Sequence, residues 1–427
     1  RSREAPQQSS RTMDSLSMQV AIPSRYRFVI GASLFLLQIA VGLNFFAPAP
    51  LFPRIMEAYQ IDKATVSLMI SGVTIVLAIF SIPAGIIAGR IGLRLAIVLG
   101  GFLISVGLLI PVAPNFTTLL LLRMVYGLGA AIVVPISSAI AMQWFPPKEL
   151  PIINGLLLMG QSFGVSLSMF FGLGIAQALG GWQAPLFLYG CVAITSTLVW
   201  VMLGRTRSTA RTVTVISLKD AIKVLPQKNT LLLGLAVVGP FAQYVALTSW
   251  LPTYYQQVRG MSPALTSLVT GLLPFVGIGA TLAGGLLPAR FGLRKPFLLV
   301  PGALIGIAGV LSFVSGNLAI TLVGIILLGI LSWVFTPTVF TIPMELPGSS
   351  PEKVGVVLGA INSMGNFSSF LSPIAVGLIA DATGSYVPGF ALWAFATLSL
   401  LTSALLLPET GPKAKRSIPK QTLVERA

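Results

Sequence analysis

The sequence GIIAGRIGLR at residues 85–94 returns later in the chain as GLLPARFGLR at residues 285–294. Each copy follows a long apolar run and ends in a short basic loop. Glycine and arginine stand at matching positions of the two copies: Gly85, Arg90, Gly92 and Arg94 in the first, and Gly285, Arg290, Gly292 and Arg294 in the second. A glycine inside so short a loop predicts a tight turn, because glycine adopts positive φ without steric cost. We expect both loops to serve in gating rather than in binding.

Further matches follow the loops in the same order in both halves. Gly127 and Pro135 correspond to Gly329 and Pro337, and Met-Gly-Gln at 159–161 corresponds to Met-Gly-Asn at 364–366. Three matches in order are difficult to obtain by chance and indicate two related halves. Internal repeats of this kind are typical of secondary transporters, whose solute site lies near the midplane between the halves.

Apolar runs occupy most of the chain. They lie near 28–50, 64–87, 95–113, 117–141, 152–178 and 183–204, and then near 230–255, 264–288, 296–314, 318–341, 354–379 and 385–407. A helix crossing the hydrocarbon needs about 20 apolar residues. Only 9% of the 427 residues are charged, against about 25% in soluble domains. The sequence therefore predicts an all-α membrane protein, with twelve transmembrane helices in two pseudo-symmetric six-helix bundles.

We expect a cytoplasmic N-terminal tail at 1–26 and an N-terminal six-helix bundle at 27–204. A cytoplasmic linker at 205–228 leads to a C-terminal six-helix bundle at 229–408 and a cytoplasmic C-terminal tail at 409–427. The first 26 residues are polar and basic and carry no apolar core of a signal peptide.

Lysine and arginine predict the orientation. With a cytoplasmic N-terminus, all 27 basic residues fall on the cytoplasmic side except Arg54, Lys63, Arg259 and the intramembrane Arg123. The positive-inside rule favours this arrangement. We expect a multi-pass protein of the cell (inner) membrane with both termini in the cytoplasm, working as a monomer among membrane lipids.

Several classes of function are disfavoured by composition. The chain has no histidine and one cysteine, Cys191, so we expect no metal site, no disulfide framework and no cofactor. Basic residues sit between apolar runs rather than on one face, which disfavours nucleic-acid binding. No nucleophile–base or acid pair stands near a membrane boundary, so we do not expect an enzyme. No nucleotide-binding P-loop occurs, and we expect no ATP-binding subunit.

With these loops and repeats the chain resembles the major facilitator superfamily over all twelve spans. Residues 85–94 are similar to its signature G-x-L-A-D-R-x-G-R-[KR], with Gly89 in the aspartate position and Leu93 in place of an arginine; Ala289 stands at the aspartate position of the second copy. In the family that aspartate helps to hold the halves together on the cytoplasmic side, so this chain departs from that latch.

Two further segments refine the resemblance. Residues 123–131, RMVYGLGAA, are similar to the family's R-x-x-x-G-x-G-A-A motif in span four. Span five lacks the G-P-x-x-G-G motif of drug/proton antiporters, which disfavours drug efflux. Residues 249–254 and 408–410 resemble anion or cyanate-type members, which implies an anionic solute.

Arg123 lies about six residues, or roughly 9 Å, inside the fourth run. A charge at such depth costs at least about 2.5–3.5 kcal/mol and normally faces a cavity on the solute path. The alternative is a structural role, with the guanidinium bonded to backbone carbonyls of span one. Both roles remain open, and they can coexist.

No aspartate or glutamate lies inside a predicted span. Proton-driven transporters usually need a buried carboxylate or histidine whose pKa lies near physiological pH. The predicted spans contain neither. A buried cation without a buried anion is best compensated by an anionic solute. The sequence predicts a small anion moved by exchange, by facilitated diffusion or together with a proton that it carries itself.

The other candidate solute contacts are uncharged polar side chains within the spans. They are Gln38, Asn44, Gln161, Gln243, Tyr244, Trp333, Thr336, Asn362 and Asn366. Gln161 and Asn366 are favoured because the repeat places amides at matching points of both halves. Gly85 with Gly89, Gly127 with Gly129, and Gly160 with Gly164 predict close helix contacts.

The leading hypothesis is a secondary active or facilitative transporter of a small anionic solute. The alternative within the same class is an exporter of neutral or amphiphilic compounds, in which Arg123 is purely structural.

Overall fold

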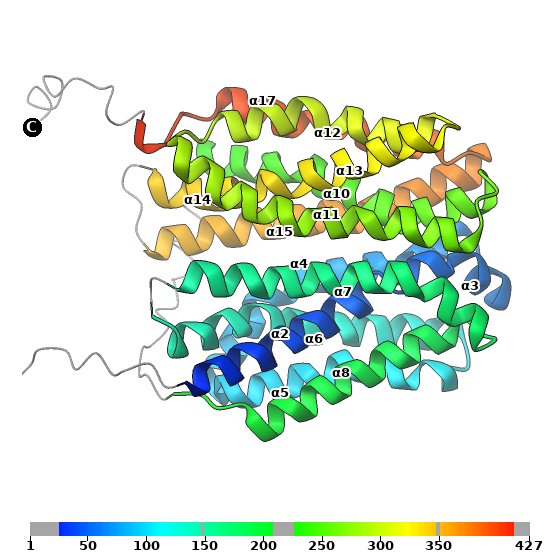
Figure 1. Cartoon of the computed structure of the whole chain (residues 1–427), viewed down its shortest axis with the longest axis horizontal. Helices are drawn as coiled ribbons and strands as arrows, with labels where there is room; N and C mark the ends of the chain where they lie inside the picture. The colour runs from blue at the N-terminus through cyan, green and yellow to red at the C-terminus, as the bar shows by residue number, and fades with distance from the viewer. Residues whose placement is uncertain (1–24, 147–148, 208–225, 347–350, 414–427) are drawn as a thin grey trace, which may run out of the picture.

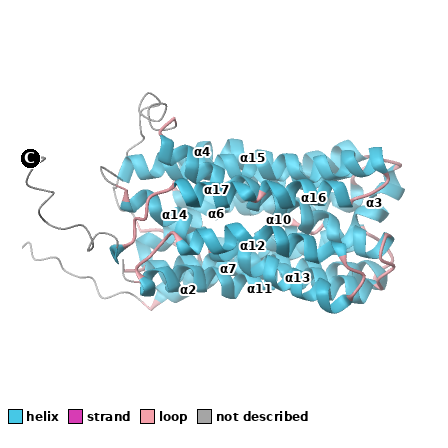
Figure 2. Ribbon diagram, turned by 90° about the horizontal axis from the view of Figure 1, so that it is seen from above, coloured by secondary structure: helices cyan, strands magenta, loops and turns pink. Residues whose placement is uncertain are grey.

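The computed structural model describes residues 25–146, 149–207, 226–346 and 351–413 (Figure 1). Most of the predicted N-terminal tail, much of the linker and the end of the C-terminal tail lie outside the described residues. Within those four ranges every regular element is a helix (Figure 2). Twelve helical segments are long and apolar enough to cross a membrane, which confirms the predicted number of spans.

The first six spans are built from the elements α2 to α8. Their bounds are α2 Tyr26–Phe45, η2 Ala49–Leu51, α3 Phe52–Tyr59, α4 Lys63–Ile91, α5 Leu93–Ile104, η3 Ser105–Val112, α6 Phe116–Trp144, α7 Leu150–Ala178 and α8 Gln183–Leu203. The last six spans are built from α10 to α17. Their bounds are α10 Lys228–Gln257, α11 Pro263–Phe291, α12 Pro296–Val314, α13 Leu318–Val334, α14 Thr336–Glu345, α15 Pro351–Thr383, α16 Val387–Ala396 and α17 Leu398–Leu406.

The first span is interrupted where prolines follow it. Helix α2 ends at Phe45, and Pro48, Pro50 and Pro53 come next. Proline lacks an N–H and disfavours helix in the residue before it. The tenth span breaks in the same way between α13 and α14, where Pro337 is one of the first residues of the new helix. An apolar count could not predict these breaks, because the residues around them remain apolar.

Elements of the two chain halves lie on opposite sides of the molecule (Figure 1). The halves meet mainly where α4 packs against α15 and where α7 packs against α11. Helix α10 also contacts η2 of the first half.

Packing differs between the two ends of the helix assembly. We call the end that carries Lys63 and Asp381 the Lys63 end, and the end that carries residues 85–94 the Arg90 end. One buried apolar cluster joins both halves toward the Lys63 end, with Phe52 and Trp250 among its members. Toward the Arg90 end the buried clusters are separate, one confined to the first half and one to the second. The halves are therefore sealed together at the Lys63 end.

Most of the predicted small-residue contacts are present. A Cβ on Gly164 would collide with backbone atoms of Ile39 in α2, and a Cβ on Gly129 would lie 2.7 Å from the Gly100 carbonyl. The prediction is wrong for Gly85 and Gly89, where a Cβ would meet nothing within 4 Å. No close helix contact forms there, because this part of α4 lies at the Arg90 end, where no neighbouring element covers the two glycines.

Both repeat loops turn on glycine, as predicted. Gly92 has φ 88° and Gly292 has φ 69°, which is the region that other residues rarely adopt. The surroundings of the loops differ: Arg94 donates to the Val201 carbonyl at 3.2 Å, whereas Arg294 pairs with a carboxylate.

Candidate functional site

Arg123 is almost fully buried in α6, with 3% of its surface exposed. Its guanidinium donates to three backbone carbonyls: Nη1 to Asn44 at 2.7 Å, Nη2 to Phe45 at 2.6 Å and Nε to Met69 at 3.1 Å. The charge therefore ties α6 to both α2 and α4.

The first two of these carbonyls explain why an arginine is tolerated at this depth. Asn44 and Phe45 are the last residues of α2, and the final carbonyls of a helix have no partner within it. Unpaired carbonyls in a membrane interior are costly, and the negative end of the helix dipole attracts a cation. Arg123 thus caps α2, which is the structural role that the sequence left open.

The charge of Arg123 is not neutralised by an acid. Among the described residues no carboxylate pairs with it, and its nearest ring is Tyr126, 4.9 Å from the guanidinium carbon. A cavity of about 10 Å³, room for one water molecule, lies beside it with Asn44 and Gly107 in its wall. The described part of the membrane interior therefore holds a positive charge that carbonyls stabilise but no acid neutralises.

Three predicted contact residues are buried amides. Asn44 donates to the carbonyls of Ala40 and Tyr189 at 3.0 and 3.1 Å, joining α2 to α8. Gln38 is buried, and its Oε1 has no partner. Gln243 is fully buried against Gly309 of α12. Asn44 therefore stabilises packing within the first half, whereas Gln38 and Gln243 have buried amide atoms without a hydrogen-bond partner.

An aromatic group spans the boundary between the halves near the middle of α10. The ring of Tyr244 lies edge-on to Phe46 of the first half, with centroids 6.3 Å apart, and edge-on to Trp333 at 5.4 Å. Trp333 also packs against Gly277 of α11 and is part-exposed, although it lies within a span and faces the protein interior. Phe46 was not among the predicted contact residues.

Two polar side chains lie close to the Tyr244 hydroxyl. Trp333 Nε1 and the hydroxyl of Thr248 are buried and make no well-aligned hydrogen bond elsewhere, and the Tyr244 hydroxyl is the hydrogen-bonding group within their reach. Thr248 is 3% exposed and stands one helical turn from Tyr244 on the same face of α10. Buried donors without acceptors are rare in folded proteins, and here the Tyr244 oxygen can accept from both groups.

The predicted amides of α15 lie away from its most exposed apolar side. Phe367 and Leu371 are 52% and 41% exposed. Asn362 and Asn366 are each five residues from one of them, about 140° around the helix. Each asparagine donates to a carbonyl one turn earlier in its own helix. Asn362 is exposed and Asn366 is part-exposed.

Two more predicted contact residues interact within their own half of the chain. Gln161 of α7 is part-exposed, and its backbone carbonyl packs directly against Gly42 of α2. Thr336 is buried and donates to the Ser332 carbonyl at 3.3 Å. No group of three or more Cys, Asp or Glu side chains in the described ranges is placed to hold a metal ion.

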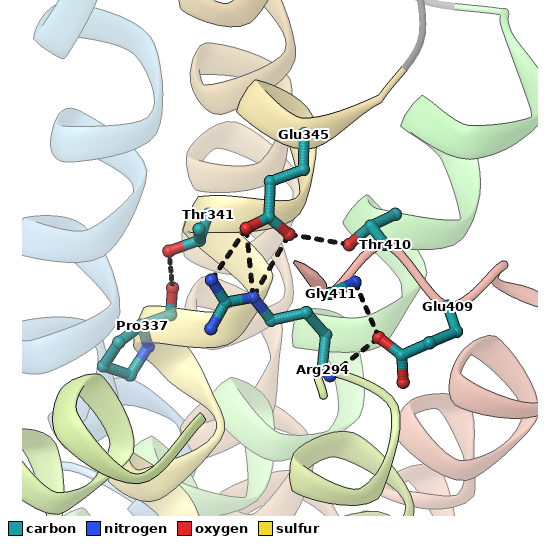
Figure 3. A network of polar contacts seen from close by, with 7 residues as sticks. All are labelled: Arg294, Pro337, Thr341, Glu345, Glu409, Thr410 and Gly411. Atoms are coloured by element: carbon teal, nitrogen blue, oxygen red, sulfur yellow. Dashed lines mark hydrogen bonds and ion pairs between the residues drawn. The ribbon is translucent and has the colours of Figure 1, made fainter. Parts of the chain in front are cut away.

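Two glutamates hold the second repeat loop in place, and this network was not predicted from the sequence. Arg294 donates through Nε and Nη2 to Glu345 at the end of α14, the shorter bond being 2.7 Å (Figure 3). Glu409 accepts from the backbone N–H groups of Arg294 and Gly411, and Thr410 donates to Glu345 at 2.8 Å. Hydrogen bonding to Glu345 raises the pKa of Arg294 above its ordinary value. The start of the C-terminal tail is thus bound to this loop.

An ion pair joins the halves at the Lys63 end. Asp381 of α15 accepts from Lys63 Nζ at 3.0 Å and from the backbone N–H of Ala64 at 3.1 Å, in the first turn of α4. A carboxylate at a helix N-terminus is favoured by the helix dipole. Little in the sequence indicates this ion pair, because Lys63 and Asp381 each stand alone near the end of an apolar run.

Comparison with known proteins gives the family. The family model of the Major Facilitator Superfamily matches residues 34–373. A nitrite extrusion protein of Bacillus subtilis is 25% identical, covering 80% of this chain and 84% of its own. A hexuronate transporter of the same organism is 24% identical, covering 80% and 85%.

Solved structures share the fold. A bacterial homologue of the human lysosomal transporter Spinster superposes with a TM-score of 0.72 at 18% identity, covering 89% of this chain and 96% of that chain. The family match spans most of the chain, and the twelve helices agree with it. The chain is a member of the Major Facilitator Superfamily.

Proposed function

We propose that this protein carries a small anionic solute across the membrane by alternating access between the bundles 27–204 and 229–408. The observation that carries the proposal is Arg123: its positive charge is buried within the first half of the chain, and no acidic partner is found among the described residues. An anion bound between the bundles would help to compensate that charge. The two relatives, named for nitrite and for hexuronate, also point to anions.

Arg123 acts on the solute through its field rather than by direct contact in this proposal. Arg123 donates to the Phe45 carbonyl; the Phe45 ring contacts the Phe46 ring, with centroids 4.8 Å apart, and Phe46 in turn contacts Tyr244. Two unit charges about 10 Å apart attract by roughly 1.5 kcal/mol at an effective dielectric constant of about 20. That energy corresponds to about tenfold in affinity.

The proposed orientation places the Arg90 end in the cytoplasm of a cell (inner) membrane, together with both termini. The distribution of lysine and arginine supports it. The structure then corresponds to an inward-facing state, because the halves share a core at the Lys63 end and have separate cores at the Arg90 end. The protein would work as a monomer in lipid, without an ATP-binding subunit.

The proposed solute contacts are the groups at the boundary between the halves. They are Tyr244, Trp333, Gln161, Asn362 and Asn366. The loops at residues 85–94 and 285–294 would act in gating, since they lie where the halves separate.

Two variants of Arg123 test the proposal. Arg123→Lys and Arg123→Gln both lose hydrogen bonds to the α2 carbonyls, but only the lysine keeps the charge. Binding is measured as the rise in melting temperature of the purified protein on adding carboxylates, inorganic anions, sugars or amines. We expect anions to stabilise the parent and the lysine variant, with affinity about tenfold lower in the glutamine variant. Stabilisation by amines or sugars without any by anions would overturn the proposal.

A second candidate is an exporter of neutral or amphiphilic compounds, favoured by the aromatic rings of Phe46, Tyr244 and Trp333 at the boundary. In that case uncharged aromatic compounds would stabilise the parent and the Arg123→Gln variant equally.

A further inference from the structure

Three membrane spans end close together at the Arg90 end of the first half. The first span begins at Tyr26, the fourth ends at Trp144 and the sixth ends at Leu203. The Tyr26 hydroxyl donates to the Leu203 carbonyl at 2.7 Å, and the centroids of the Tyr26 and Trp144 rings lie 5.8 Å apart. Tyrosine and tryptophan at the ends of spans are typical of the membrane–water boundary. This junction therefore lies at the level of the lipid headgroups.

The chain that follows α8 is held against the same two rings. Trp144 Nε1 donates to the Arg205 carbonyl at 2.9 Å, and Gln143 Oε1 accepts from the backbone N–H of Arg207 at 3.1 Å. The guanidinium carbon of Arg205 lies over the Tyr26 ring, 4.8 Å from its centroid. The guanidinium carbon of Arg207 lies over the Trp144 ring at 4.3 Å. Two hydrogen bonds to the backbone and two ring faces thus fix the positions of two neighbouring cations.

These two cations have no acidic partner. Among the described residues neither guanidinium forms an ion pair or donates a hydrogen bond. Glu149, just before α7, pairs instead with Arg27 at 3.2 Å. Arg205 is exposed and Arg207 is part-exposed. Their N–H groups are therefore accessible to an oxyanion, which an arginine can bind through two parallel hydrogen bonds.

The side chains just before these arginines are apolar and exposed. Met202 is 78% exposed and Leu203 is 41% exposed, in the last turn of α8. A ligand with an anionic head and long apolar chains would cover these side chains and pair with the arginines at once, whereas a free inorganic anion would leave the side chains uncovered. Anionic lipid is concentrated at a membrane surface, and each basic residue near that surface adds to the attraction. These surroundings favour a phospholipid over a free anion.

We propose that Arg205 and Arg207 bind the phosphate of an anionic phospholipid, with Tyr26 and Trp144 positioning the two guanidinium groups. The acyl chains of this lipid lie against the exposed end of α8. Bound in this way, the lipid holds the first residues of the linker at the membrane surface, beside the ends of α2 and α6.

Native mass spectrometry of the purified full chain tests this site. The protein is released from micelles that contain phosphatidylglycerol or phosphatidylcholine with the same acyl chains, and the affinity for the first bound lipid is measured. We expect phosphatidylglycerol to bind at least about tenfold more tightly than phosphatidylcholine. Arg205→Gln and Arg207→Gln should each weaken the binding of phosphatidylglycerol about fivefold, the effect of one cation at a membrane surface. Equal affinities for the two lipids would overturn the site.

Arg290→Gln is the matched control. Arg290 is also exposed at the Arg90 end, but it belongs to the second half. Its replacement lowers the net charge by the same amount and should leave the affinity for phosphatidylglycerol unchanged. Equal weakening by Arg290→Gln and by Arg205→Gln would mean that the lipid responds to net charge alone, and would overturn the site.

Two other occupants of the arginines give different results. Displacement of phosphatidylglycerol by an equal concentration of inorganic phosphate would assign the arginines to a free anion and overturn the lipid site. The variant that carries both Arg205→Gln and Arg207→Gln covers the second case. A lower melting temperature of this variant in lipid-free detergent, with an unchanged affinity for phosphatidylglycerol, would assign the arginines to an acidic residue of this chain and overturn the lipid site as well.

Discussion

The carboxylate of Asp381 lies 3.0 Å from Lys63 Nζ and thereby joins the last turns of α15 to the first turn of α4. The same carboxylate accepts the backbone N–H of Ala64. At the other end of α4 the family's aspartate position holds Gly89, and the repeat position, in α11, holds Ala289. The charged contact between the halves is therefore at the Lys63 end in the described residues, and opening that end requires breaking it.

Asp381→Asn should shift the protein toward a state open at the Lys63 end. The pair is part-exposed, at 29% and 28%, so we expect a cost of about 1 kcal/mol, or roughly fivefold in the population ratio. Spin labels at Glu57→Cys and Ala382→Cys, with Cys191→Ser in the background, should show longer distances in this variant.

Asp62→Asn is the matched control for Asp381→Asn. Asp62 caps α4 through the N–H of Thr65 at 2.7 Å and makes this bond within one half, so its loss should leave the label distances unchanged. An unchanged distance distribution in Asp381→Asn would contradict the role of the pair.

Gly377→Ala should also weaken the seal at the Lys63 end. A Cβ there would lie 2.8 Å from the backbone of Ala64, and backbone cannot move aside as a flexible side chain can. We expect a lower melting temperature, by differential scanning calorimetry, and a longer label distance. Gly89→Ala, with open space around the added methyl group, should change neither; equal effects of the two substitutions would refute the packing argument.

Arg294→Gln should destabilise the protein far more than Arg94→Gln, although the two arginines correspond in the repeat. Arg294 and Glu345 are 11% and 18% exposed, and breaking the pair leaves a part-buried carboxylate, costing about 2 kcal/mol or more. Arg94 makes one exposed bond to the Val201 carbonyl, worth about 0.5 kcal/mol. Hydrogen exchange at residues 292–298 should rise in Arg294→Gln; equal exchange in both variants would contradict this account.

Arg123→Met should lower stability even without solute. The substitution leaves the carbonyls of Asn44 and Phe45, at the end of α2, without their donor, and each unpaired buried carbonyl costs about 1–3 kcal/mol. Thermal unfolding in detergent measures the loss, and a variant as stable as the parent would contradict the capping role.

The fold was predictable because membrane spans follow from composition and the two related halves follow from the spacing of repeated residues. The breaks at Phe46 and before Pro337 were not, because their residues remain apolar and the chain direction changes locally. For Arg123 the sequence predicted burial and named the span-one carbonyls as an alternative; the structure was needed to show the bonds to α2 and to α4.

The grouping of Phe46, Tyr244, Thr248 and Trp333 near the boundary between the halves was only partly predictable. Tyr244 and Trp333 stand out as polar groups inside apolar runs, whereas Thr248 resembles the many hydroxyl residues that bond to their own helix. Phe46 is one apolar residue among many. Their juxtaposition arises from the contact between α10 and the end of α2, which a single sequence does not encode in any local pattern.

Transport into proteoliposomes of the anion that raises the melting temperature most tests the central claim most directly. Vesicles containing the purified protein are loaded with that anion in unlabelled form, and the entry of the labelled anion is followed against vesicles loaded with an uncharged sugar. Alternating access of an anion predicts saturable uptake that the internal anion accelerates and the internal sugar does not. Uptake that rises linearly with concentration, or that both loads accelerate equally, would contradict the account.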